Sequence, residues 1–266
     1  MNIRHIRNAT AVIEYGGKRV LIDPMLSDKG AFEPFPNSPR QDENNPLVEL
    51  PLAIEDIINN IDLVILTHLH IDHFDPKAIE VLPKDIKIYT QNEADASEVE
   101  GYDFTNVSVF NDVTHIGEIE LIKTDAQHGH GEILKMTGHV HGLVLKHSEE
   151  PTLYLAADTV WFDGVEKTLK AHHPDIIVLN GGANQFFEGG PLVMDEHDVL
   201  KVAHTLSLAQ IVVVNMEAVN HWHLSREELN EFINSNDLGN RVVVPNDGEL
   251  LTFEKQIFVY LMKCIA

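Results

Sequence analysis

A nine-residue stretch, THLHIDHFD at positions 67–75, constrains this chain more than any other feature of the sequence. Three histidines and two aspartates follow directly on DLVIL at 62–66, a segment with the length and composition of a buried strand. His68 and His70 are two residues apart, so in extended backbone their side chains point to the same side. Because imidazole and carboxylate groups are good ligands for zinc, manganese or iron, the stretch predicts a metal site at the end of a core strand.

The rest of the chain predicts strands and helices in mixed order, which is typical of an α/β sandwich. No repeat, low-complexity tract or linker marks a boundary, so we predict a single domain over residues 1–266. A long loop is expected at 24–51, which holds six of the twelve prolines and is either a solvated excursion or a packed wall over a site. The expected helices are 53–60, 76–82, 164–171, 195–206 and 226–234; the expected strands are 2–7, 10–15, 19–22, 62–66, 86–89, 107–110, 118–124, 140–146, 152–156, 175–179 and 210–214.

The amino-acid composition argues against several classes of binding partner. The formal net charge is −23, from 42 acidic and 19 basic side chains, which disfavours a nucleic-acid partner. Cys264 is the single cysteine, so the sequence excludes an internal disulfide and a zinc site built on several thiolates, and fits a reducing compartment. No apolar run approaches the roughly 18–20 residues that span a bilayer, and the polar start MNIRHIRNAT is unlike a signal peptide. We therefore expect a cytoplasmic protein with no membrane partner; the apolar residues 257–266 would form a last strand or an interface segment and would permit a homo-oligomer.

The pattern His-x-His-x-Asp-His after a hydrophobic strand resembles the metallo-β-lactamase superfamily, and the resemblance extends over essentially the whole chain. The segments LIKTDAQH, ending at His128, and YLAAD, ending at Asp158, are similar to two further ligand-bearing strands of that family, and AVNHW around His221 is similar to its last ligand segment. VLIDP at 20–24 is similar to the early strand that supports the site. The long loop and the chain length are most similar to the branch that contains ascorbate-6-phosphate lactonase and N-acyl-phosphatidylethanolamine phospholipase D.

The resemblance implies a four-layer αβ/βα sandwich with two divalent metal ions, zinc or alternatively manganese, at one edge of two facing sheets. It implies that His68, His70 and His128 hold one metal, that Asp72, His73 and His221 hold the second, and that Asp158 bridges the two. His130 competes with His128 as third ligand and would otherwise contact substrate or protonate a leaving group. Asp23, Asn184 and His223 are candidates for supporting a ligand or lining the substrate pocket, whereas His139 is interpreted as a strand residue without a role in the site.

The predicted function is hydrolysis of an ester, lactone or phosphodiester of a small molecule by a hydroxide that two metals share. Asp72 would orient that hydroxide and accept its proton. The alternatives are a di-iron redox protein, a nuclease on the same fold, and a metal-binding protein without turnover. His70 stands where the di-iron proteins typically carry glutamate, and the net charge of −23 argues against a nuclease.

Overall fold

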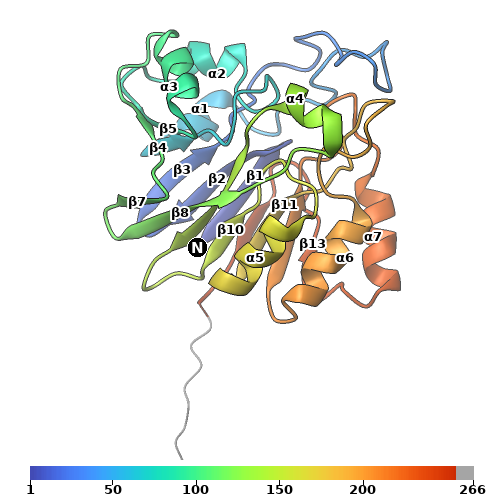
Figure 1. Ribbon diagram of the computed structural model, residues 1–266. Helices are drawn as coiled ribbons and strands as arrows, with labels where there is room; N and C mark the ends of the chain where they lie inside the picture. The colour runs from blue at the N-terminus through green and yellow to red at the C-terminus, as the bar shows by residue number, and fades with distance from the viewer. Residues whose placement is uncertain (256–266) are drawn as a thin grey trace, which may run out of the picture.

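Two seven-stranded sheets face each other in the computed structural model, which describes residues 1–255, and helices cover their outer faces (Figure 1). The first sheet has the order β14-β1-β2-β3-β4-β5-β6 and the second β13-β12-β11-β10-β9-β8-β7. The strands of the first sheet are β1 (Asn2–Arg7), β2 (Thr10–Tyr15), β3 (Lys18–Ile22), β4 (Leu63–Ile65), β5 (Lys87–Thr90), β6 (Val107–Val109) and β14 (Leu250–Thr252). The strands of the second sheet are β7 (Val113–Ile116), β8 (Ile119–Asp125), β9 (His141–Lys146), β10 (Leu153–Leu155), β11 (Ile176–Asn180), β12 (Gln210–Val214) and β13 (Val242–Val243).

Helices on the first sheet's side come early in the chain, and those on the second sheet's side come late (Figure 1). The early helices are α1 (Ile54–Ile58), α2 (Pro76–Val81) and α3 (Glu93–Glu100); the late ones are α5 (Asp163–His172), α6 (Glu196–Thr205) and α7 (Arg226–Ser235). A 3-10 turn (Gly131–Ile133) and the short helix α4 (Leu134–Thr137) lie between β8 and β9. The predicted four-layer sandwich is therefore confirmed.

The central core lies between the sheets. Ile13 and Val20 of the first sheet pack in one cluster with Leu143 and Leu153 of the second, and all four side chains are buried. Separate clusters fill the space between each sheet and its own helices. The two sheets thus share one core; a single domain over residues 1–266 stays a prediction.

Most predicted elements are present within a few residues of the expected bounds, and the differences have local causes. The helix α3 was not predicted because its sequence EADASEVE is largely acidic and buries only Ala96 and Val99; the side chain of Asn92, which accepts a hydrogen bond from the backbone N–H of Asp95, caps its start. The strand β7 was missed because its side chains alternate between exposed and half-buried positions. Residues 257–266, for which a strand or an interface segment was expected, lie outside the described part of the chain.

The loop at 24–51 is a packed wall rather than a solvated excursion. The guanidinium of Arg7, fully buried on β1, donates hydrogen bonds to the carbonyl oxygens of Met25, Ser27 and Val48, at 2.9, 2.8 and 2.9 Å. Burial lowers the pKa of Arg7 to about 10, which still leaves it protonated at neutral pH. Both ends of the loop are thus tied to β1 by one cation.

Strand direction brings the predicted ligands together. The strands β3 and β4 run parallel in the first sheet, as do β10, β11 and β12 in the second, and β8 runs the same way as β10 because both are antiparallel to β9. Residues that follow the carboxyl ends of parallel strands meet at one edge of a sheet. None of the helices in the described residues is long and apolar enough to span a membrane.

Candidate metal centre

The seven predicted metal ligands all lie on connections that leave the strands at this edge. The turn after β4 carries four of them, and the connections after β8, β10 and β12 carry one each. Six of the seven side chains are buried, and His70 is half-buried. In order along the chain they are His68, His70, Asp72, His73, His128, Asp158 and His221.

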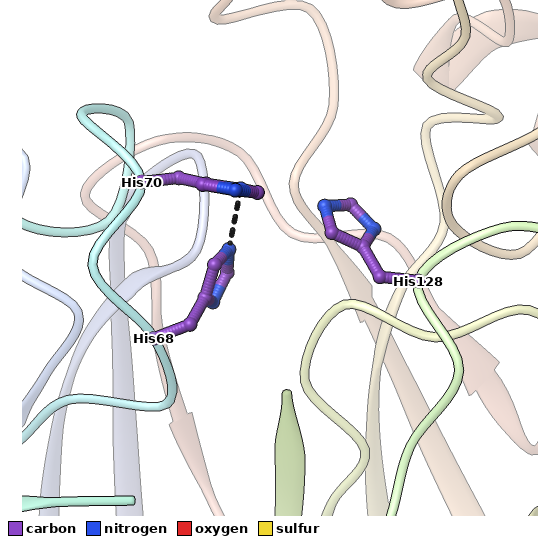
Figure 2. A group of neighbouring side chains, drawn as sticks. All are labelled: His68, His70 and His128. Atoms are coloured by element: carbon purple, nitrogen blue, oxygen red, sulfur yellow. Dashed lines mark hydrogen bonds between the residues drawn. The ribbon is translucent and has the colours of Figure 1, made fainter. Parts of the chain in front are cut away.

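Imidazole nitrogens converge on one carboxylate oxygen. Oδ2 of Asp158 lies 3.3 Å from Nε2 of His73, 3.3 Å from Nε2 of His128 and 3.9 Å from Nε2 of His68. Nδ1 of His70 lies 2.9 Å from Nε2 of His68, and Figure 2 shows His128 facing this pair from the opposite wall. Four ring nitrogens and a carboxylate oxygen therefore surround a small space that is closed to most solvent.

The outward nitrogens of three of these rings have oxygen partners. Nδ1 of His73 donates to Oδ2 of Asp23 at 2.9 Å, and Nδ1 of His128 donates to the carbonyl oxygen of Leu192 at 2.9 Å. Nδ1 of His68 lies 3.1 Å from Oγ1 of Thr67, which itself donates to Asp23 at 2.6 Å. These hydrogen bonds assign the proton of each ring to Nδ1, so that each Nε2 carries a lone pair into the site. Asp23 thus contacts His73 directly and His68 through Thr67; that it supports metal ligands stays a prediction.

The site passes a test of fit for a metal ion. Nε2 of His73 is buried and has no hydrogen-bond partner among the described residues. A buried polar atom without a partner is costly unless something outside the protein satisfies it. A divalent cation bound to these imidazole and carboxylate groups would do so, and the donor set suits zinc or manganese.

Two buried amides hold the other oxygen of Asp158. Asn180, the last residue of β11, donates to Oδ1 at 2.5 Å, and Asn215, directly after β12, donates at 3.1 Å. Ala157 and Asn215 have positive φ angles of 59° and 61°, an uncommon conformation that is often found at functional sites. Sequence analysis missed both asparagines; the signal available was their common position, at the end of a buried strand that runs parallel to its neighbours.

Asp72, on the turn after β4, and His221, after β12, are the two remaining predicted ligands. The amide of Asn8 donates to the backbone oxygen of Asp72 at 3.0 Å and lies 3.4 Å from its Oδ2, which is 3.9 Å from Nε2 of His73. The ring of His221 lies between Phe35, edge-on at 4.7 Å between centroids, and Phe186, stacked at 5.8 Å. Both ligands line the same cavity as His70, His128 and Asp158.

Electrostatics make the cluster receptive to positive charge. Burial lowers the pKa of His68 well below its ordinary value and that of His221 to about 4, so both rings are neutral at pH 7. Burial acts against protonation of His73 as well, but the carboxylates of Asp158, Asp72 and Asp23 raise its pKa well above the ordinary value. Burial alone would raise the pKa of Asp158, yet the neighbouring imidazoles hold it well below its usual range. A metal cation can take the place of the proton that these carboxylates favour.

Donor atoms within 4.8 Å of one another form two overlapping triads among the described residues. One triad is His68, His70 and His128, which matches the predicted first metal site. The other is His68, His73 and Asp158, which shares only part of the predicted second site. Asp72 and His221 lie outside both triads, so their assignment to the second metal stays a prediction.

An open cavity of about 330 Å³ leads from the surface to the cluster. Apolar side chains supply much of its wall, and among the described residues no lysine or arginine lines it. The apolar members are Phe35, Leu69, Ile71, Met136, Phe186 and Leu192.

The other residues predicted to contact substrate or support a ligand differ in how near they lie to the metal cluster. The amide of Asn184 is buried and lies 3.5 Å from Oδ1 of Asn215, one step behind Asp158. The side chains of His130 and His223 are exposed and do not line the cavity, and Nδ1 of His130 lies 3.1 Å from the amide of Gln127. Their roles toward substrate stay predictions, whereas His128 is the member of the pair that points into the cluster.

Comparison with known proteins gives the same picture. The family model described as the beta-lactamase superfamily domain matches residues 18–216. The UPF0173 protein YddR of Bacillus subtilis is 50% identical over 254 residues, which is 95% of this chain and all of the relative. A UPF0173 metal-dependent hydrolase of Saccharolobus solfataricus is 25% identical over 94% of this chain and 98% of its own length.

Two solved structures are similar over nearly the whole chain. An isothiocyanate hydrolase from Delia radicum gut bacteria is 40% identical, with a TM-score of 0.92 over 96% of this chain and 100% of the other. A possible metal-dependent hydrolase from Veillonella parvula is 33% identical, with a TM-score of 0.93 over 95% of this chain and 99% of the other. The chain belongs to the beta-lactamase superfamily, in a group whose named relatives include metal-dependent hydrolases.

Proposed function

We propose that this member of the superfamily is a dinuclear metal-dependent hydrolase of small, uncharged molecules whose reacting atom is an electrophilic carbon. The convergence of His68, His73 and His128 on Oδ2 of Asp158, with the outward nitrogen of each ring bonded to oxygen, is the observation that carries the proposal. Two bound cations would ionise a water near pH 7 and polarise the bond under attack.

The chain's own groups would divide the remaining work. Asp158, held at Oδ1 by two amides, presents Oδ2 to both halves of the site. The carboxylate of Asp72, at the inner end of the cavity and fixed through its backbone oxygen by Asn8, is placed to orient the attacking water and accept its proton. No serine or cysteine nucleophile is required for this chemistry.

The residues that line the cavity favour some of the expected substrate classes over others. A phosphodiester carries a negative charge that proteins usually bind with lysine or arginine, and within residues 1–255 neither lines this cavity. An apolar wall with few polar groups is suited to holding the uncharged body of a small ligand. Esters and lactones therefore fit better than phosphodiesters among the three classes expected from the sequence.

Isothiocyanates are a further candidate within the same class. The 40% identical solved relative is an isothiocyanate hydrolase, and the central carbon of an isothiocyanate is an uncharged electrophile. Addition of water to that carbon, followed by cleavage of its bond to nitrogen, converts R–N=C=S and H₂O to R–NH₂ and COS, with all atoms accounted for. The apolar group R would lie along the wall that Phe35, Phe186 and Leu69 form.

The test has two stages. Protein loaded with zinc or manganese, and metal-free protein as the control, are assayed on matched substrates: a lactone, a thioester and an isothiocyanate with the same phenylethyl group, and a phenylethyl phosphodiester. We expect metal-dependent turnover of at least one uncharged substrate and a much lower kcat/KM for the phosphodiester. Equal turnover by the metal-free protein, or a preference for the phosphodiester, would contradict the proposal.

A further inference from the structure

His221 differs from the other buried histidines of the site in how its ring is held. His68, His73 and His128 each direct Nδ1 to an oxygen within 3.1 Å. Nδ1 of His221 is buried but has no hydrogen-bond partner among the described residues. A hydrogen bond on the outer nitrogen is the usual means by which a protein fixes a ligand histidine. The orientation of His221 must therefore depend on packing and on its backbone.

The side chains that pack against the ring of His221 come from two loops that are far apart in the sequence. Phe35, on the 24–51 loop, meets the ring of His221 edge-on at 4.7 Å, and Phe186 stacks on it at 5.8 Å. The backbone N–H of Gln185 donates to the carbonyl oxygen of His221 at 2.9 Å, and that of Phe187 donates to the carbonyl oxygen of Asn37 at 2.8 Å. Phe35 and Phe186 also line the cavity. The same aromatic side chains thus orient a predicted ligand and face the substrate.

Asn220, the residue directly before His221, holds the backbone of Phe35 through its side chain. Its side chain is fully buried, and its Oδ1 accepts a hydrogen bond from the backbone N–H of Phe35 at 2.8 Å. Its amide nitrogen lies within hydrogen-bond distance of the backbone oxygens of Phe35 and Pro39, at 3.2 and 2.7 Å, and of Oγ of Ser38, at 2.8 Å. One side chain therefore determines the position of five consecutive residues of the loop.

A second asparagine and an arginine extend the same connection. Oδ1 of Asn45 accepts from the backbone N–H of Asn220 at 2.7 Å, and its amide donates to Oδ1 of Asn220 at 3.0 Å. Arg40 donates to the backbone oxygens of Asn220 and Trp222, at 3.0 and 2.9 Å, and its guanidinium lies 3.7 Å from the centre of the indole ring. The loop and the segment that carries His221 are thus joined on both sides of that histidine.

We infer that Asn220 is a positioning residue that couples the substrate wall to the second metal site. It holds Phe35 against the ring of His221, and so keeps Nε2 of this ring directed into the cavity. Loss of the Asn220 side chain should weaken the second metal and misplace Phe35 in one step, while the first metal, held by His68, His70 and His128, should be unaffected. This inference rests on the proposed dinuclear function.

The test compares Asn220→Ala with the wild type and with two other variants. Asn45→Ala removes the neighbouring asparagine but leaves the bonds of Asn220 to Phe35, Ser38 and Pro39 in place. Val99→Ala is a matched control for general instability, because it opens a cavity in α3, within the cluster between the first sheet and its helices. Each protein is titrated with zinc against a chromophoric chelator, and amide hydrogen exchange is measured by mass spectrometry.

We expect two zinc equivalents in the wild type and in Val99→Ala. In Asn220→Ala the second equivalent should bind about 10–100-fold more weakly, the effect typical of losing support for a ligand, with the first unchanged. Amide exchange should rise together in residues 35–45 and 218–223. Asn45→Ala should show the same changes to a smaller extent.

Either of two results would overturn the inference. The first is that Asn220→Ala retains both equivalents at wild-type affinity. The second is that it loses both to the same degree as its melting temperature falls. A wild type that binds a single equivalent would instead overturn the dinuclear proposal. In that case the exchange data on metal-free protein still decide the inference, since they report the coupling of the loop to residues 218–223 without any metal. Faster exchange in one segment alone would then contradict it.

Discussion

The two walls of the metal site are built in different ways. The wall after β4 carries four predicted ligands in six consecutive residues, 68–73. Asp23 accepts a hydrogen bond from one of them, His73, directly and contacts a second, His68, through Thr67. A second wall, after β12, contributes His221, and its position depends on Phe35 and Phe186 from distant parts of the chain and on the neighbouring Asn220. The first wall is stabilised by short polar contacts within one sheet; the second depends on a loop of 28 residues, 24–51, that must first pack correctly.

This difference has a consequence for function. A wall made of local hydrogen bonds holds its ligands whether or not substrate is present. A wall made by a loop that also lines the cavity couples metal binding to substrate binding, because Phe35 packs on His221 and also lines the cavity. Variants in the first wall should therefore affect the chemistry itself, and variants in the second should affect the second metal and the KM.

The largest effect is expected for Asp72→Ala, in the first wall. Loss of a positioned carboxylate that accepts a proton typically reduces the rate by about 10²–10⁴-fold, and we expect kcat to fall within that range. The far-ultraviolet circular dichroism should not change, because Asp72 lies on a turn after β4 rather than in a helix or sheet. Activity within tenfold of the wild type would show that the proton goes elsewhere.

The next largest effect is expected for Asp23→Ala. It removes the carboxylate that accepts from both Thr67 and His73, and loss of such support typically lowers metal affinity by about 10–100-fold. Zinc titration should show weaker binding of both equivalents, because Thr67 in turn contacts His68. Weakening confined to one equivalent would remove the proposed contrast between the walls.

Phe35→Leu tests the second wall with a smaller change. Aromatic pairs contribute about 0.5–1.5 kcal/mol beyond the area that they bury, so KM for an aromatic substrate should rise about 2–10-fold, with a weaker second metal. Initial-rate kinetics on the phenylethyl substrates measure this, and Leu192→Val, a change at another apolar residue of the cavity wall, is the control. A rise in KM of the same size in both variants would mean that Phe35 acts only as a wall.

His139→Ala should have the smallest effect. Its side chain is exposed and does not line the cavity, and such surface changes usually alter the free energy of unfolding by no more than about 0.5 kcal/mol. Kinetics and thermal melts should match those of the wild type. A loss of activity comparable with that of Asp72→Ala would place the site elsewhere.

The two walls also differ in how far the sequence predicts them. The ligands at 68–73 are adjacent in the chain, so their pattern after a hydrophobic strand indicates both the metal site and its place in the fold. Asp158 and His221 were predicted through resemblance and strand order. The amides of Asn180, Asn215 and Asn220 were not predicted. A position at a strand end marks the first two, but the contacts of all three arise from tertiary packing, which local sequence does not specify.

The loop at 24–51 is a second case in which local sequence does not predict tertiary packing. Its proline content predicts an irregular segment but not whether that segment packs. The buried cation of Arg7 and the buried amide of Asn220 decide the outcome. Arg7 lies 20 and 41 residues from its contacts at Ser27 and Val48, and Asn220 lies 185 residues from its contact at Phe35. Such long-range hydrogen bonds set the second wall, whereas local pattern sets the first.

Anomalous diffraction from crystals of the zinc-loaded protein, recorded at energies on both sides of the zinc absorption edge, tests the central claim most directly. The account predicts two peaks about 3.5–4 Å apart, one beside His68, His70 and His128, the other beside Asp72, His73 and His221, with Asp158 between them. A single peak, or two peaks away from Asp158, would contradict it.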